Sequence, residues 1–160
     1  MGHTENYLDI LRDTLARKKE YLEKLLSLTQ EQSVIAKSQP FDEDAFERTI
    51  DAKDILIDNV NEADKGFSAV YNRIRSELSS NTLAYRDRLA EIQNLIRACV
   101  DTGLAIEKLE ELNRASLEQA LASGFKGMNQ AKQSRSVASK YYKSMSSGYV
   151  NDSFLYDRKK

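Results

Sequence analysis

The sequence predicts an all-α protein, an elongated antiparallel three-helix coiled-coil bundle followed by a C-terminal tail. Three observations carry this prediction. Apolar residues recur in alternating steps of three and four along three long segments, the heptad spacing of helices that pack along their length. Between residues 3 and 122 the chain has one Pro and two Gly, whereas a β-rich fold needs many more turn residues. The breaks between the segments are short, and short connections make neighbouring helices antiparallel.

The first helix is expected over residues 4–38. Pro40 cannot continue a helix and biases Gln39 away from helical backbone angles, so the helix ends before them. The expected core positions follow the heptad and then lose apolar character toward the end of the helix. They are Leu8, Leu11, Leu15, Lys18, Leu22 and Leu25, followed by Thr29, Gln32 and Ala36.

The second helix is expected over residues 42–79. Asp42 has a side chain suited to an N-cap, and Phe41 and Phe46 occupy the two positions of a hydrophobic staple. Its heptad is the most regular of the three, because eight of its ten core positions are apolar or aromatic. Those ten positions are Phe46, Ile50, Lys53, Ile57, Val60, Asp64, Phe67, Tyr71, Ile74 and Leu78.

The third helix is expected over residues 81–122, after a polar break at residues 79–82 that offers several capping oxygens. Its heptad positions are Tyr85, Leu89, Ile92, Ile96, Cys99, Gly103 and Ile106. Five further apolar residues widen this face beyond a narrow seam: Leu95, Val100, Leu104, Leu109 and Leu112. A face this broad predicts either more than one neighbouring helix within the chain or a partner outside it.

Charged residues interrupt the heptads at three core positions, Lys18, Lys53 and Asp64. In a hairpin that closes near residue 40, facing residues have numbers that sum to about 80, which brings Lys18 next to Asp64. We predict that this pair meets, with both charged groups reaching the edge of the seam. Such a pair sets the register of the first two helices more than it stabilises them. The alternative is that both residues lie on a solvated flank of the bundle.

Charge and composition divide the chain into a long-helix body of residues 1–122 and a tail of residues 123–160. The body carries a net charge of −7 and the tail one of +6, and the tail holds six of the thirteen aromatic residues. A basic, aromatic segment suits a peptide that becomes ordered on docking. Its partner is the acidic body, another protein or nucleic acid. A weakly helical stretch near residues 131–145 leaves open whether the tail is partly ordered or contains a short fourth helix.

The composition excludes several kinds of site. One Cys and one His cannot form a zinc, haem or iron–sulfur site, or a disulfide, within the chain, so we expect no metal and no cofactor. His3 lies near the N-terminus, and Cys99 lies on the apolar face of the third helix, where a buried structural thiol is expected. Glu107, Glu110 and Glu111 are expected on a solvated helix surface. We therefore expect no enzymatic activity.

The remaining functions are binding functions. The chain has no apolar run of about 18 residues and no apolar N-terminal stretch, so we expect a cytoplasmic protein without a membrane span or signal peptide. The net charge of −7 on the body argues against nucleic acid as the partner. A homodimeric structural coiled coil and a helical chaperone or adaptor both fit the broad third helix, and periodicity alone does not separate them.

Three stretches of the chain carry a family resemblance. One is NYLDIL at residues 6–11, and another is KDILID at residues 53–58 with DKGF at residues 64–67. The most characteristic is the tail, with VASKYYK at residues 137–143 and FLYDRKK at residues 154–160. In these runs and in their order, the sequence resembles the bacterial flagellar export chaperones of the FlgN/FliT type over nearly its whole length.

The resemblance implies a cytoplasmic, substrate-specific chaperone for flagellar axial proteins that are secreted through the type III export apparatus. The implied partner is a hook-associated (hook–filament junction) or filament-cap protein, with components of the export apparatus as further partners. The sequence does not decide between the FlgN-like and FliT-like branches. We expect neither nucleic acid nor membrane as a partner, and a monomer or weak homodimer.

The resemblance also implies where the partner binds, on the late apolar stripe of the third helix and on the tail. The residues concerned are Ile106, Leu109, Leu112, Leu117, Leu121, Tyr141, Tyr142 and Phe154. This assignment assumes that the stripe side chains have no permanent partner within the chain. In the free protein, the tail would fold back over the stripe and shield it.

Overall fold

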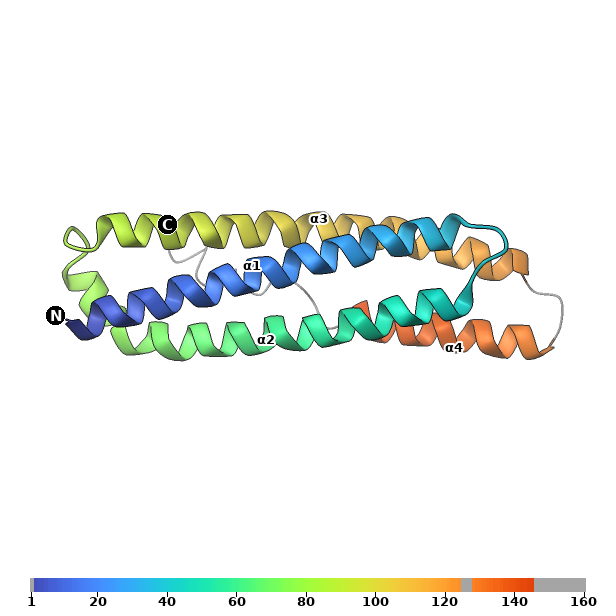
Figure 1. Cartoon of the computed structure of the whole chain (residues 1–160), viewed down its shortest axis with the longest axis horizontal. Helices are drawn as coiled ribbons and strands as arrows, with labels where there is room; N and C mark the ends of the chain where they lie inside the picture. The colour runs from blue at the N-terminus through green and yellow to red at the C-terminus, as the bar shows by residue number, and fades with distance from the viewer. Residues whose placement is uncertain (1, 125–127, 146–160) are drawn as a thin grey trace.

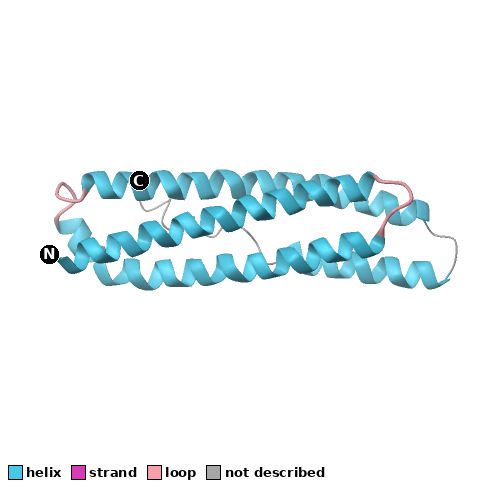
Figure 2. Cartoon of the chain, viewed as in Figure 1, coloured by secondary structure: helices cyan, strands magenta, loops and turns pink. Residues whose placement is uncertain are grey.

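The structure, a computed structural model, describes residues 2–124 and 128–145. Within these two ranges the chain forms four helices and no strand: α1 (Gly2–Lys37), α2 (Glu43–Ser80), α3 (Arg86–Gly124) and α4 (Met128–Met145). The three long helices run side by side and make an elongated molecule (Figures 1 and 2). At 38 residues, α2 is about 57 Å long. The predicted all-α antiparallel bundle is confirmed, and residues 128–145 form a short fourth helix.

α2 and α3 are joined mainly through the other two helices rather than by packing directly on each other, and we refer to them as the α2–α3 pair. α1 packs along both α2 and α3, and α4 packs against the same two helices. Because α1 and α4 share both neighbours, they lie on opposite sides of the pair, and α1 crosses in front of it in Figure 1. α4 lies beside the first half of α2 and the second half of α3, so within residues 2–124 and 128–145 the other half of the pair has a helix on one side only.

Three clusters of buried apolar residues follow one another along the bundle. The first comprises Leu8, Leu11, Leu15, Phe67, Ile74, Leu78, Tyr85, Ile92 and Ile96. The second comprises Leu22, Leu25, Ile57, Val60, Cys99 and Ile106. The third comprises Ala36, Phe46, Ile50, Leu117, Leu121, Val137 and Tyr141. The heptad positions therefore form the core, Cys99 is buried as expected, and α4 contributes to the third cluster.

The helix boundaries follow from local chemistry. Asp42 accepts a hydrogen bond from the Ala45 N–H at 3.0 Å, and the rings of Phe41 and Phe46 lie 5.6 Å apart, so the predicted N-cap and staple are confirmed. The third helix begins at Arg86, and the expectation that it begins near residue 81 is wrong. Residues 82–85 form turns instead, because backbone hydrogen bonds such as Ala84 N–H to Asn81 O close the chain tightly there.

Lys18 and Asp64 meet as the hairpin arithmetic predicts, with Nζ 2.6 Å from Oδ1. The Lys18 side chain is 1% exposed and that of Asp64 is 17% exposed. The alternative of a solvated flank is therefore wrong, and so is the expectation that the Lys18 ammonium reaches the edge of the seam. The Asp64 side chain is less buried than that of Lys18, but its Oδ2 is buried as well, so both charged groups pay a desolvation cost. That the pair sets the register remains a proposal.

Candidate functional site

The groove between α2 and α3, on the side away from α1, is the candidate site. We call the part beside α4 the covered half and the remainder the open half. The open half contains a hollow of about 260 Å³. It is lined by Leu11 of α1 together with Phe67, Tyr71, Arg75, Leu78, Ser79, Thr82, Leu89, Ile92, Gln93 and Ile96 of α2, α3 and the turn between them.

In the covered half, α4 inserts two side chains into the third core cluster. Val137 is fully buried and Tyr141 is 1% exposed. The Tyr141 ring meets that of Phe46 edge-on, with centroids 5.5 Å apart. Leu117 and Leu121 of α3 belong to the same cluster. The apolar floor of the covered half is therefore filled by the chain itself.

Lys53 stands at the centre of a buried polar network below α4. Its Nζ lies 2.8 Å from Oε1 of Gln32 on α1 and 2.8 Å from Oε1 of Glu110 on α3. The Tyr141 hydroxyl of α4 donates to the same Glu110 oxygen at 3.0 Å, and the Lys53 ammonium lies 5.9 Å from the centre of the Tyr141 ring. These four side chains connect all four helices at one level of the bundle.

Burial changes the acid–base behaviour of this network. It lowers the pKa of Lys53, and the neighbouring Glu110 carboxylate opposes that shift. Burial also raises the pKa of Tyr141 far above its usual value, an effect that the negative charge of Glu110 and the hydrogen bond to it increase. Tyr141 therefore stays a neutral donor while α4 is docked.

The rim of the covered half holds three further contacts, each between a donor on α4 and a carboxylate below it. Lys140 Nζ lies 2.7 Å from Asp51 Oδ1, and this hydrogen bond raises the pKa of Lys140. The two others are Tyr142 OH to Glu118 Oε1 at 2.6 Å and Ser144 Oγ to Asp54 Oδ1 at 2.7 Å.

The structure places the expected binding residues in different environments. Ile106, Leu117, Leu121 and Tyr141 are all buried within the chain. The assumption that the late stripe of the third helix has no partner within the chain is therefore wrong, because α1, α2 and α4 cover most of it.

The remaining expected residues are less covered. Leu109 is half-buried, whereas Leu112 is 58% exposed and Tyr142 is 37% exposed. Phe154 lies outside the described residues. Four of the expected binding residues come together at the covered half of the groove. They are Tyr141 and Tyr142 of α4 and Leu117 and Leu121 of α3.

Glu110 is the residue that sequence reasoning misplaced. It was expected on a solvated surface and is 2% exposed, because α4 covers it and Lys53 neutralises it. One signal could have found it. In a hairpin that closes near residue 82, facing residues sum to about 164, which places Lys53 opposite residue 110 or 111.

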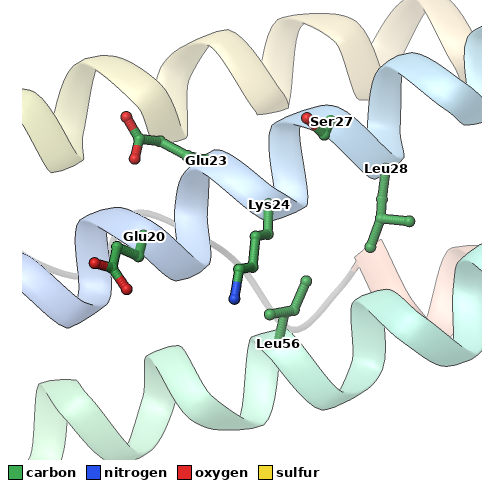
Figure 3. A pocket seen from close by; sticks show the side chains of 6 residues that line it. All are labelled: Glu20, Glu23, Lys24, Ser27, Leu28 and Leu56. Atoms are coloured by element: carbon green, nitrogen blue, oxygen red, sulfur yellow. The ribbon is translucent and has the colours of Figure 1, made fainter.

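The other hollows and side-chain clusters of the described chain give less support for a functional site. A wide hollow of about 540 Å³ lies between α1 and α2, where Lys24 and Leu56 point toward one another (Figure 3). In the described parts of the chain, no group of three or more His, Cys, Asp or Glu side chains could hold a metal ion. None of the described helices has a stretch long and apolar enough to cross a membrane.

Comparison with known proteins gives one result. A family model described as FlgN protein matches residues 1–146, which include α1, α2, α3 and α4. No curated protein and no solved structure matches the chain.

Proposed function

The chain belongs to the FlgN family of flagellar type III export chaperones, and from that premise we propose that it binds the amphipathic terminal segments of flagellar axial proteins in the cytoplasm before export. The family is one of chaperones rather than of enzymes. The proposed clients are the hook–filament junction proteins or the filament cap.

The observation that carries this proposal is the α2–α3 groove. Its open half is lined mainly by apolar side chains, with Arg75, Ser79, Thr82 and Gln93 among them, and has no helix of the described chain over it. Its covered half is filled by one short helix. An amphipathic client helix can lie in such a groove and bury its apolar face. If it enters at the open half and replaces α4, the groove extends along the bundle and Leu117 and Leu121 become part of the contact.

The energetics suit temporary binding. A specific contact of this kind buries about 1,000 Å² or more. Ordering a client segment costs about 2–5 kcal/mol of the gross interaction free energy, which holds the affinity at a level from which the export apparatus can remove the client. Shielding of the groove by α4 lowers the affinity further, because α4 must leave first.

The test is calorimetric titration of the full chain with purified hook–filament junction and filament-cap proteins of the same organism. We expect one of them to bind, and Leu89→Lys in the open half to weaken binding at least about tenfold, because an ammonium group enters an apolar contact. Val34→Lys is the matched control, since Val34 is an exposed α1 residue (68%) and does not line the groove. Absence of binding to every axial protein, or equal effects of the two variants, would contradict the proposal.

The alternative is a homodimeric structural coiled coil or adaptor without a secreted client. It would use the same open half to pair two copies. Sedimentation velocity separates the two, because a client-binding chaperone is expected to be a monomer or weak homodimer. A tight homodimer that Leu89→Lys dissociates would favour the structural coiled coil.

A further inference from the structure

The two halves of the groove differ in charge. The residues of α2 and α3 that flank the covered half, 43–58 and 107–124, carry a net charge of −6. The segments that flank the open half, 59–80 and 86–106, carry equal numbers of acidic and basic side chains. Residues 128–145, which form α4, carry four basic side chains and no acidic one. The charge of the covered half is thus complementary to the helix that now lies in it.

The hydrogen bonds in the covered half have one direction. In each of the four contacts described above, α4 donates and a carboxylate of α2 or α3 accepts. The accepting residues are Asp51, Asp54, Glu110 and Glu118. Because an ionised carboxylate can only accept hydrogen bonds, a helix that replaces α4 satisfies these groups only with donors, and water can do so where they are exposed.

The four acceptors do not contribute equally. The Asp51 side chain is 62% exposed, so water can replace its partner when α4 leaves. Glu110, whose side chain is 3% exposed, lies under the docked helix, where water cannot reach it. A replacement helix without a hydroxyl opposite Glu110 would leave that oxygen with fewer hydrogen bonds in a buried place, which is costly. Glu110 therefore favours a helix that brings a hydrogen-bond donor to it, and the carboxylates of the rim favour a helix that is basic.

We infer that the covered half is a selective site for a basic amphipathic helix that carries a tyrosine, with its hydroxyl donor, at the position of Tyr141. This inference rests on the proposed function, since it describes which client segment can replace α4. An acidic helix of equal apolar area is rejected by the rim, and a purely apolar one is penalised at Glu110. The segment in the open half has no such requirement, because that half carries no net charge.

The test uses synthetic peptides and the full chain. Val137→Asp is introduced to undock α4, because Val137 is fully buried and a carboxylate there opposes docking. Fluorescent peptides with the sequence of residues 128–145 are then titrated into this variant. One keeps the native sequence, one carries Tyr141→Phe, Tyr142→Phe and Ser144→Ala, and one has its four basic residues replaced by Glu.

We expect the native peptide to bind, the peptide with the three hydroxyl substitutions to bind at least about tenfold more weakly, and the acidic peptide to bind more weakly still. Raising the salt from about 0.05 to 0.5 M should weaken the native peptide, because exposed charges are screened. Equal affinity of the native peptide and the peptide with the three hydroxyl substitutions would overturn the selectivity, as would failure of the native peptide to bind.

Matched changes in the chain locate the effect. Asp51→Asn with Asp54→Asn removes two charges from the covered half, and Asp87→Asn with Asp101→Asn removes two exposed charges from the open half. The first pair should weaken the native peptide and the second should not, and equal effects would count against the inference. If an axial protein binds the chain while the peptides bind alike, the selectivity fails and the chaperone function stands. If no axial protein binds, the proposed function fails whatever the peptides do.

Discussion

α1 and α4 occupy equivalent positions on opposite sides of the α2–α3 pair, but they are held there by different interactions. α1 is 36 residues long and contributes leucines that are at most 1% exposed to two core clusters, among them Leu8, Leu15, Leu22 and Leu25. α4 is 18 residues long, and its described side chains contribute two apolar anchors and a set of hydrogen-bond donors to carboxylates.

This difference determines how easily each helix can leave the bundle and return to it. Burying a leucine side chain stabilises a fold by about 1.5–3 kcal/mol, and water offers no substitute for it. A hydrogen bond from a rim hydroxyl or ammonium to a carboxylate contributes little net, because water replaces it when the contact opens. We therefore expect α4 to undock at a far lower free energy than the three-helix body unfolds.

The largest effect is expected at Lys53, where both regions meet. Lys53→Met leaves the Glu110 carboxylate buried without its ammonium partner, and we expect a loss of about 3–5 kcal/mol in the free energy of unfolding. Urea denaturation followed by circular dichroism measures this loss. Adding Glu110→Leu to Lys53→Met should restore much of the stability, because a buried ion pair replaced by apolar residues is often neutral. A double variant as unstable as the sum of the two single variants would show that the pair does not act as a unit.

The next effect separates the two regions. Leu22→Ala should lower the free energy of global unfolding by about 2–5 kcal/mol, because it opens a cavity in the seam of α1. Val137→Ala should leave the urea midpoint nearly unchanged, because it weakens only the docking of α4. Amide hydrogen exchange provides the local measurement, with faster exchange in residues 136–144 of Val137→Ala and little change in α1. Equal shifts of the urea midpoint in the two variants would mean that α4 and the body unfold together.

The sequence predicted most of the body because its signals are local. The heptads, the Asp42 cap and the Phe41–Phe46 staple depend on spacing within one segment, and the structure has all of them. The contact between Lys18 and Asp64 needed only one assumption, that of a hairpin that closes near Pro40. Short connections make such arithmetic work, because they leave little freedom in the register of neighbouring helices.

The groove was harder to predict because it depends on which helix covers which face. The burial of Leu117, Leu121 and Glu110 depends on the helices that pack over them, α4 among them, and the weak apolar pattern of residues 128–145 did not settle whether α4 forms. Glu110 also has a charge that predicts a solvated position unless its partner is known. The heptad spacing predicts that one face of a helix is apolar. The three-dimensional structure is needed to see whether another helix of the same chain packs on that face.

The smallest effect is expected from pH, and it tests whether Tyr141 is as enclosed as the comparison with α1 requires. Its pKa is raised above the ordinary value of 10.0 by burial and by Glu110. A phenol whose folded pKa is raised contributes stability that is fully present below about pH 10 and is lost as the pH rises above it, because the undocked form then gives up its proton more readily. Lys53 has the opposite sign, since its lowered pKa makes the docked form gain stability as the pH rises toward 10.5.

Tyr141→Phe separates the two contributions because it removes the phenol and leaves Lys53 in place. Phenolate absorbance of the wild-type chain minus that of Tyr141→Phe gives the titration of Tyr141 alone. We expect the midpoint of this difference curve to lie above 10, and the loss of α4 docking above pH 10 to disappear in the variant, which leaves the opposite contribution of Lys53. A difference curve centred at 10 would mean that water reaches the Tyr141 hydroxyl, so that α4 would be held by its rim alone and the contrast with α1 would be greater than the structure indicates.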